Sequence, residues 1–435
     1  MPTYQDLPEQ TKELIRDKHT HALRSGFHNW PTLAFGKMPA MGDHRWTSDL
    51  IYSTWFQAEK GTPPDNGLEF RKGNSEGGFD LLDFQYLPKE SWFQGNADLT
   101  LSLNRRGEGA KIEIPIPFYG AGMSYGSISE NIMIARAKAA KSWKIFTSTG
   151  EGGYPPFLIP YKEHVITQVA TGLFGVREET MQYAPIIEFK YAQGAKPGLG
   201  GHLLGNKTTV AVAKMRESVP WMSMFSPFPF HSVYSVEDHK KQVDWAKAVN
   251  PNALIAIKVS TPIDVDMVAV GSYYANAHIL QIDGGYGGTG AAPEISKKNI
   301  AMPIELAIPR VHKYLLSEGI REEIVIMASG GIRTADDIAK AIALGADGCI
   351  LGTTELVALG CTHCANCERG RGCPFGLTTT DPELTALVDP DWGAERLSNL
   401  YASFAYQLQW ILRKLGLKSI RELRGRTDLL RYEKK

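Results

Sequence analysis

The chain lacks an excess of either charge, because 47 Lys and Arg residues balance 47 Asp and Glu residues over 435 positions. No global electrostatic field therefore favours nucleic acid or an anionic membrane surface as a partner. The chain also lacks any run of about eighteen apolar residues, and no charged-then-apolar leader follows Met1. We therefore expect no membrane span and no secretion, and the cytoplasm is the default location.

Cysteine is scarce and unevenly placed. The five cysteines are Cys349 and, shortly after it, Cys361, Cys364, Cys367 and Cys373. A disulfide framework would spread its pairs over the chain, whereas four thiols within thirteen residues indicate ligands of one metal centre. The closing Cys373-Pro374 is typical of ferredoxin-type ligation of an iron–sulphur cluster. A structural zinc site is the alternative, because zinc accepts the same four thiolates.

From Ile114 onward, short apolar runs alternate with helix-like segments at the spacing of βα units. We predict eight strands, at Ile116–Met123, Lys144–Thr149, Pro185–Lys190, Trp221–Ser226, Leu254–Val259, His278–Ile282, Ile324–Ala328 and Gly348–Leu351. Amphipathic stretches predict helices at Glu130–Lys141, Lys207–Arg216, Val236–Val249, Ile263–Ala275, Ile304–Ser317 and Ala335–Leu344. The connection from Thr149 to Pro185 has room for one or two further helices. This α/β pattern fits a (β/α)8 TIM barrel over about 240 residues, with a doubly wound sheet as the alternative.

Three parts follow from this prediction. Residues 1–113 form an N-terminal extension, residues 114–360 form the barrel, and residues 361–435 form the cysteine loop and a C-terminal helical segment. Helical spacing is present at Asp6–Ser25 in the extension. At the other end, Arg396–Leu415 and Ile420–Leu430 predict helices that pack on the barrel.

Polar and glycine residues concentrate directly after the predicted strands. The stretch Leu280–Gly290 runs from an apolar strand into five glycines within seven residues, which allows a bound group to approach the backbone closely. Ser329-Gly330-Gly331 and Gly352-Thr353 follow the last two strands, where barrels bind phosphate with backbone N–H groups. Two turns that need positive φ are the alternative. Since catalytic groups lie at the C-terminal ends of barrel strands, we predict the active site at this mouth.

Six motifs in order resemble the FMN-binding synthase domain of glutamate synthase, over about residues 114–385. They are Gly120–Ser129, Thr149–Gly153, Ala192–Gly198, Ser226–Asp238, Gly284–Pro293 and the cysteine cluster. The resemblance implies an FMN barrel with an iron–sulphur centre, in which reduced flavin delivers hydride to 2-iminoglutarate. That imine forms from 2-oxoglutarate and ammonia, and its reduction yields L-glutamate.

Other activities stay open at this point. The chain is also similar to the flavin-barrel subunit of N-methylglutamate synthase, which exchanges methylamine for ammonia on glutamate. A flavin barrel enzyme that acts on a 2-hydroxy acid is a second alternative. The third is an electron-transfer or assembly subunit that needs partner chains for turnover.

The resemblance implies catalytic roles for Lys258, Lys298, Glu151 and Gln193. Lys258 would place its ammonium near the flavin N1–C2 edge or a substrate carboxylate, where charge develops on reduction. Lys298 would meet a substrate carboxylate, and the neighbouring Lys297 would be exposed. Glu151 and Gln193 would hydrogen-bond flavin or substrate, with helix capping as the alternative for Glu151.

The implied FMN contacts cover the mouth of the barrel. Asp283 would anchor the glycine loop, and His231 is either a packed loop residue or an acid–base group. The full implied set comprises Met123, Ser124, Ser127, Thr149, Gln193, Lys258, Asp283, Gly284, Gly285, Gly287, Gly288, Ser329, Gly330, Gly331, Gly352 and Thr353.

The cysteine spacing departs from the family pattern. The family's [3Fe–4S] cluster uses three cysteines spaced x5 then x4. Here Cys361-x5-Cys367 fits, Cys367-x5-Cys373 is one residue longer, and Cys364 is extra, so [4Fe–4S] is the alternative. Leu199 also replaces a glutamate of the family pattern, and Ser232 replaces an acidic residue, so substrate contacts are expected to differ.

Partners follow from the same comparison. No glycine-rich fingerprint opens a dinucleotide-binding βαβ unit, which favours an electron-donor protein such as ferredoxin over direct nicotinamide reduction. The chain has Pro2 where the family's glutaminase nucleophile stands, and no glutaminase-like region. We therefore expect free ammonia or a separate glutaminase or amidotransferase subunit as the nitrogen source. We also expect a small-molecule substrate, no nucleic-acid partner, and an oligomer.

Overall fold

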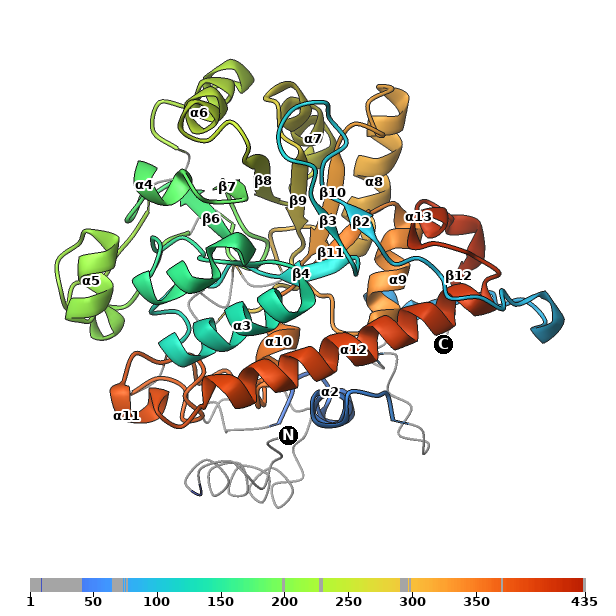
Figure 1. Cartoon of the computed structure of the whole chain (residues 1–435), viewed down its shortest axis with the longest axis horizontal. Helices are drawn as coiled ribbons and strands as arrows, with labels where there is room; N and C mark the ends of the chain where they lie inside the picture. The colour runs from blue at the N-terminus through green and yellow to red at the C-terminus, as the bar shows by residue number, and fades with distance from the viewer. Residues whose placement is uncertain are drawn as a thin grey trace.

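Eight parallel strands form a ring at the centre of the computed structural model, which describes residues 9, 41–64, 73, 75, 77–197, 200–226, 230–289, 296, 299–368 and 371–432 (Figure 1). The ring contains β4 (Phe118–Gly120), β5 (Thr147–Ser148), β6 (Val165–Ala170), β7 (Ile186–Lys190), β8 (Leu254–Ser260), β9 (Ile279–Asp283), β10 (Val325–Ser329) and β11 (Gly348–Leu351). Their order is β4-β11-β10-β9-β8-β7-β6-β5. The Gly120 N–H donates to the Phe146 carbonyl at 2.9 Å and brings β4 back to β5. The predicted (β/α)8 barrel is therefore confirmed.

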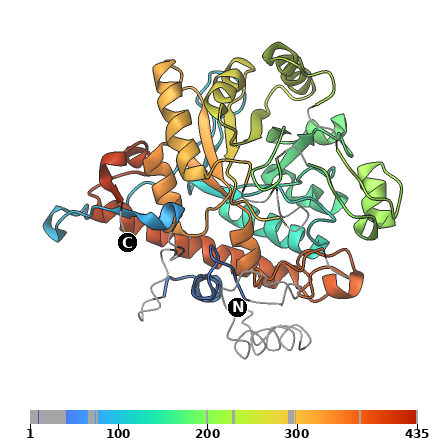
Figure 2. The ribbon, with the colours of Figure 1, turned by 180° about the vertical axis from the view of Figure 1, so that it is seen from behind.

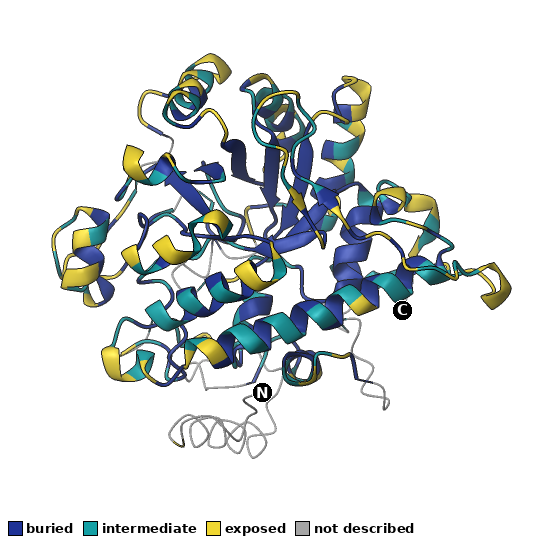
Figure 3. Ribbon diagram, in the orientation of Figure 1, coloured by how far each residue is buried: buried dark blue, intermediate teal, exposed yellow. Residues whose placement is uncertain are grey.

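Helices cover the outside of this ring. They are α3 (Glu130–Trp143), α4 (Glu178–Met181), α5 (Val210–Arg216), α6 (Val236–Val249), α7 (Val265–Tyr274), α8 (Ile304–Ser317), α9 (Ala335–Leu344) and α10 (Thr353–Ala358). Seen from behind, α8 and α9 stand along the outside of the strands (Figure 2). The strands themselves are buried, as expected for a parallel sheet with helices on its outer face (Figure 3). Three predicted helices, α6, α8 and α9, have the predicted bounds.

One predicted strand of the ring is wrong, and one observed strand of the ring was not predicted. Trp221–Ser226 forms no strand, and only Met224 makes an isolated bridge, to Leu203. The side chains of Trp221 and Phe225 are 62% and 67% exposed, so this apolar run does not belong to the core. The third strand of the ring is instead β6, inside the connection that we expected to hold helices. Its buried Thr167 and Gln168 break the apolar run that would have marked it as a strand.

Segments from both ends of the chain wrap the barrel. From the N-terminal side come α2 (Ser48–Lys60), β1 (Leu82–Phe84), β2 (Leu101–Ser102) and β3 (Glu113–Ile114), and from the C-terminal side come α11 (Pro382–Thr385), α12 (Pro390–Lys414), α13 (Ile420–Leu423) and β12 (Leu430–Tyr432). Five short 3-10 turns lie at Gly78–Leu81, Lys89–Ser91, Pro156–His164, Gly205–Lys207 and Thr427–Leu429. The long α12 runs beside α3 and α2 (Figure 1). Antiparallel pairing joins β1 to β12 and β2 to β3.

The terminal predictions hold in part. Helix α12 confirms the helix predicted at Arg396–Leu415, but the one predicted at Ile420–Leu430 ends at Leu423 and gives way to β12. The helix predicted at Asp6–Ser25 lies outside the described residues except for Glu9. Among the described helices we find none with the length and apolar character needed to cross a bilayer.

A buried carboxylate joins the barrel to both wrapping segments. Asp347, just before β11, accepts hydrogen bonds from Arg321, from Arg105 of the N-terminal extension and from Arg424 after α13, at 2.9, 2.5 and 2.9 Å. The Ile326 N–H donates a fourth, at 2.7 Å. Burial alone would raise the pKa of Asp347, but the three guanidinium groups outweigh it and lower the pKa. Its stabilising effect is present above about pH 4 and is lost as acid protonates it.

We predict that Asp347→Asn lowers the free energy of unfolding by about 3–5 kcal/mol, because three arginines lose their buried counter-charge. Urea denaturation followed by circular dichroism measures the change. The control is Asp244→Asn, which removes only an exposed i,i+4 pair with Lys240 and should cost about 0.5 kcal/mol. Equal midpoints for the two variants would contradict the stabilising role of Asp347.

Candidate active site

The parallel register brings polar side chains together at one end of the ring. Lys190, at the end of β7, pairs in register with Lys258 of β8, and Lys258 pairs with Gln281 of β9. Two residues after Gln281, Asp283 of β9 pairs with Ser329 of the next strand, β10. Lys190, Asp283 and Ser329 end their strands, and Lys258 and Gln281 lie two residues before the strand ends, so all five are at the predicted mouth of the barrel.

Asp283 links three of the loops at this mouth. Its Oδ1 accepts a hydrogen bond from the Ser329 hydroxyl at 2.6 Å, and its Oδ2 accepts one from the Gly194 N–H at 2.8 Å. The Gln281 amide donates to the Ser329 hydroxyl at 2.8 Å. Asp283 therefore lies where an anchor of the glycine loop would act.

The glycine loop after β9 is needed for packing between loops. A Cβ atom on Gly284 would lie 2.6 Å from the Ile304 Cβ, and one on Gly288 would lie 2.1 Å from the Thr353 hydroxyl. A Cβ on Gly285 would meet the Ala301 carbonyl at 2.5 Å, whereas one on Gly287 makes only ordinary contacts. These glycines thus allow neighbouring protein atoms to pack closely against the loop backbone, in addition to any group that binds at the mouth.

The two loops predicted to bind phosphate also lie at this end. Gly330 and Gly331 have φ of +84° and +115°, values that favour glycine. A Cβ on Gly330 would lie 2.3 Å from the Gly284 carbonyl, so this turn packs directly on the glycine loop. Gly352 and Thr353 follow β11 and open α10. The loops after β9, β10 and β11 are therefore adjacent.

A cluster of buried charges lies on the opposite side of the mouth, around Glu151. The Lys190 ammonium is 2.8 Å from Glu151 Oε2 and donates to Gln193 Oε1 at 2.8 Å. Burial alone would raise the pKa of Glu151, but Lys190, Lys196 and Arg216 outweigh it and lower the pKa to about 2. Glu151 is thus ionised at neutral pH, and its carboxylate contacts Lys190 rather than capping a helix.

Burial lowers the pKa of the cationic groups in this cluster. Burial lowers the pKa of Lys190 to about 8, with Glu151 opposing the shift and Lys258 and Lys196 adding to it. Burial also lowers the pKa of Arg216 to about 10. Such shifts are typical of sites that bind and turn over charged ligands.

Lys258 is a buried cation that forms no ion pair with any described residue. Lys258 is 5% exposed, and its ammonium makes no hydrogen bond or ion pair with any of the described residues. A buried ammonium in this state is costly unless a ligand compensates it. The mouth is therefore built to receive an anionic group.

The four clustered cysteines lie next to this site. Burial raises the pKa of Cys361, and the thiols of Cys367, Cys373 and Cys364 raise it further. The His363 N–H donates to Cys361 Sγ at 3.3 Å. No three His, Cys, Asp or Glu side chains of the described residues are already arranged around a metal position. The set of donors nevertheless fits thiolate ligation.

The cysteine segment is fastened to the barrel by Lys207. Its ammonium donates to the Cys367 carbonyl at 2.8 Å and to the Thr378 carbonyl at 3.3 Å, and pairs with Glu368 at 3.1 Å. Glu368 in turn raises the pKa of Lys196, against the stronger lowering effect of burial. Glu368 of the cysteine segment therefore interacts electrostatically with Lys196 of the charge cluster. Cys349 is instead buried within β11.

The remaining predicted residues take varied positions. The Ser124 and Ser127 hydroxyls are 2.9 Å apart, and Arg216 donates to the Ser124 hydroxyl at 2.9 Å. The Thr149 hydroxyl donates to the Gly150 carbonyl. Met123 is half-buried beside the core, and His231 is exposed. Lys297 and Lys298 lie outside the described residues, as does Leu199.

Sequence reasoning missed Lys190, Lys196 and Arg216. Lys190 lies at the end of a strand and Lys258 near the end of the next one, and this similarity was the available signal. Arg216 closes α5, and its distance from the mouth along the sequence concealed the contact with Ser124.

Comparison with known proteins gives the chain its relatives. Residues 93–418 match the family model described as "Conserved region in glutamate synthase". The chain is 43% identical over 321 residues to an archaeal glutamate synthase [NADPH] of Methanocaldococcus jannaschii, covering 74% of this chain and 63% of that protein. It is 36% identical to the glutamate synthase [NADPH] large chain of Azospirillum brasilense, covering 72% of this chain and 21% of that one.

Solved structures support the fold. A flavocytochrome b2 mutant with pyruvate bound has a TM-score of 0.53 at 14% identity, covering 97% of this chain and 92% of that one. A lactate oxidase of Pediococcus acidilactici has a TM-score of 0.53 at 15% identity, covering 88% of this chain and 95% of that one. At such low identity the likeness extends to the fold alone.

We predict that Glu151→Gln lowers the pKa of Lys190 below its value of about 8, because the ammonium loses its ion pair while Lys258 and Lys196 remain. The pH dependence of reductive methylation at Lys190, measured by peptide mass spectrometry, gives the midpoint. In the wild type, burial of this charge costs stability below about pH 8, and stability rises as the pH increases from there to about 10.4.

The matched control for that experiment is Glu217→Gln, which removes an exposed partner of Arg177. It should leave the Lys190 midpoint unchanged. A midpoint that stays near pH 8 in Glu151→Gln would mean that another group keeps Lys190 protonated.

Proposed function

Because this chain belongs to the glutamate synthase family, we propose that it binds FMN at the barrel mouth and reduces 2-iminoglutarate, formed from 2-oxoglutarate and ammonia, to L-glutamate. The observation that carries the proposal is the buried, uncompensated ammonium of Lys258 beside the Lys190–Glu151 pair. Bound FMN would supply hydride chemistry, and an iron–sulphur cluster would supply single electrons. The chain spans 63% of the length of its archaeal relative, so the activity of the complete assembly is part of the proposal.

The residues at the mouth fit an anionic planar cofactor. Lys258 would face the part of the flavin that becomes negative on reduction, and no partner among the described residues must first be displaced. Gly330 and Gly331 would allow the phosphate to approach the backbone after β10. Asp283 would hold the loops after β7 and β10 in place around the cofactor.

The charge cluster suits a dicarboxylate substrate. Lys196 and Arg216 are buried cations beyond the Lys190–Glu151 pair and would bind carboxylate groups. Lys190, with a pKa near 8, would hold a proton at its Nζ and release it near neutral pH. Gln193 orients that ammonium through a hydrogen bond. Lys298, outside the described residues, stays a proposed substrate ligand from the family motif.

The four cysteines would hold the cluster beside the same mouth. Cys361, Cys364, Cys367 and Cys373 lie within thirteen residues, and Lys207 fastens their segment through the Cys367 carbonyl. Four thiolates permit [4Fe–4S] as well as the family's [3Fe–4S]. In this proposal a donor protein such as ferredoxin delivers the electrons, and ammonia is free or comes from a separate glutaminase or amidotransferase subunit.

The activity test consists of two anaerobic assays of the full chain, one with 2-oxoglutarate, ammonia and a chemically reduced ferredoxin, and one with L-glutamate and methylamine. Glutamate formed from ammonia supports the proposal. N-methylglutamate formed instead, or turnover that begins only when partner chains are added, would replace it with one of the two alternative subunit roles. A protein that releases no flavin on heating would contradict the FMN site.

We predict that Lys258→Ala lowers turnover about 10²–10³-fold, because it removes a charge aimed at the reacting cofactor. FMN content, measured by absorbance of the released flavin, should change less than about twofold. The control is Lys313→Ala on the exposed face of α8. Equal losses of turnover and FMN in Lys258→Ala would mean that this lysine only binds the cofactor.

We predict iron and acid-labile sulphide, and no stoichiometric zinc, in protein purified without oxygen. Cys364→Ser distinguishes the two cluster types, because loss of the fourth ligand should leave a [3Fe–4S] signal in electron paramagnetic resonance. Cys349→Ser is the matched control, since Cys349 lies in β11 apart from the cluster. Zinc in place of iron would overturn the redox assignment of this segment.

A further inference from the structure

Arg45 reaches the mouth of the barrel from outside the ring of strands. It lies in the segment before α2, and two backbone hydrogen bonds fix its position. The Arg45 N–H donates to Asp43 Oδ1 at 2.8 Å, and Arg333 donates to the Arg45 carbonyl at 2.9 Å. Arg333 lies two residues after the Gly330–Gly331 turn. Its contact with Arg45 therefore ties the N-terminal extension to the predicted phosphate loop.

The Arg45 side chain is buried against that loop. The residue is 5% exposed, and its guanidinium stacks on the Tyr286 ring at 4.0 Å from the centroid. Its Nη2 is 3.9 Å from the point where a Cβ on Gly331 would stand. Arg45 therefore contacts the glycine loop after β9 and borders the turn after β10.

One edge of this guanidinium has no protein partner. The Nε and Nη2 atoms are both buried and make no hydrogen bond among the described residues. These two nitrogens form the edge with which arginine grips an oxyanion through two parallel N–H bonds. Stacking on Tyr286 occupies the face of the group and leaves this edge available.

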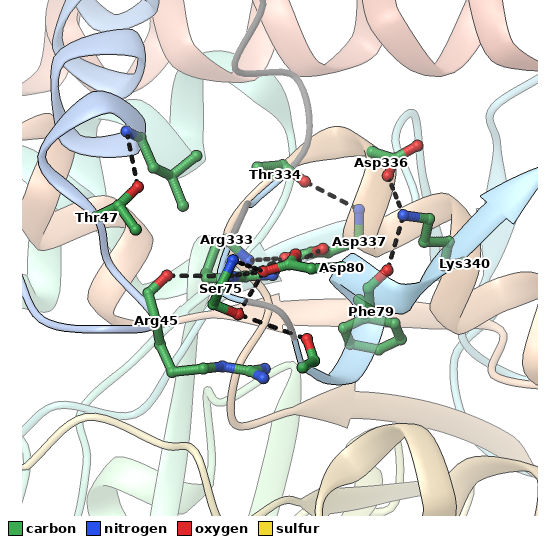
Figure 4. Close-up of polar contacts among 12 residues, drawn as sticks. Arg45, Thr47, Ser75, Phe79, Asp80, Arg333, Thr334, Asp336, Asp337 and Lys340 are labelled. Atoms are coloured by element: carbon green, nitrogen blue, oxygen red, sulfur yellow. Dashed lines mark hydrogen bonds and ion pairs between the residues drawn. The ribbon is translucent and has the colours of Figure 1, made fainter. Parts of the chain in front are cut away.

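The neighbouring cations are already neutralised. Arg333 pairs with both Asp80 and Asp337, and Lys340 pairs with Asp336 and donates to the Phe79 carbonyl (Figure 4). In the same view the Arg45 side chain runs below this cluster, and no dashed line reaches its guanidinium (Figure 4). Arg45 is thus the cation left for a ligand on this side of the loop.

Glu305 is a carboxylate close to this free edge, but it forms no ion pair with Arg45. Glu305 Oε1 and Arg45 Nη1 lie 2.6 and 2.7 Å from the point where a Cβ on Gly78 would stand, yet the two groups form no ion pair. Glu305 Oε2 is buried without a hydrogen-bond partner. Burial raises the pKa of this carboxyl and outweighs the opposing effect of Arg45, which disfavours the anion that would compete for Arg45.

We propose that Arg45 binds the phosphate of FMN beside the Gly330–Gly331 turn, so that the N-terminal extension completes the cofactor site of the barrel. This inference rests on the proposed function, because it requires that the mouth bind FMN. It assigns to the segment at residues 41–47 a part in selecting a phosphorylated flavin.

The test compares FMN with riboflavin, which lacks the phosphate. Apoprotein of the full chain is titrated with each flavin, and binding is read from the quenching of flavin fluorescence. We expect Arg45→Gln to weaken FMN binding about 10-fold or more, as for loss of a charged hydrogen-bond pair. Riboflavin affinity should stay within about twofold, and Arg45→Lys should restore part of the FMN preference.

Arg106→Gln is the matched control, because Arg106 also stacks on a tyrosine, Tyr273 at 4.2 Å, away from the glycine loops. It should leave the FMN-to-riboflavin ratio unchanged. An unchanged ratio in Arg45→Gln, or an equal loss for both flavins, would overturn the role of Arg45 in phosphate binding. Wild-type protein that binds neither flavin would instead overturn the proposed function as well.

Discussion

The parallel register of β7 and β8 is the constraint on which the mouth depends. Because Lys190 and Lys258 occupy paired positions, the barrel hydrogen bonds hold two ammonium groups at the same height in a buried place. Glu151 compensates Lys190, and Lys258 has no such partner among the described residues. The hydrogen bonds between the strands of the ring stabilise the fold and offset this electrostatic cost. A site that is unfavourable by itself therefore persists in a stable fold.

Elements outside the ring supply much of the site. Arg216 comes from the end of α5, Lys207 fastens the cysteine segment, and Arg45 comes from the N-terminal extension. The barrel therefore provides the frame, and the wrapping segments provide charges around its open end. This division explains why the extension, in which sequence reasoning found no chemistry, lies against the glycine loops.

Sequence patterns predicted the regular parts of the molecule well. The helices α6, α8 and α9 have one polar face each, and their bounds were predictable from periodicity and capping residues such as Ser235 and Thr334. Strand β6 was missed because Gln168 faces a buried Glu188, and such an internal polar pair is invisible without the fold. At the mouth, Lys258 was predicted from a motif, whereas Arg45 and Arg216 depend on tertiary contacts that no local pattern encodes.

The pairing of β1 with β12 has a consequence for how the molecule is made. Gln85 donates to the Leu430 carbonyl across 345 positions of the chain. During synthesis, the β1 segment leaves the ribosome long before β12, so its pairing edge stays open until residues 430–432 have been made. By then every strand of the ring has been synthesised. Pairing over so long a sequence separation slows this step of folding and leaves an unpaired strand edge on the nascent chain.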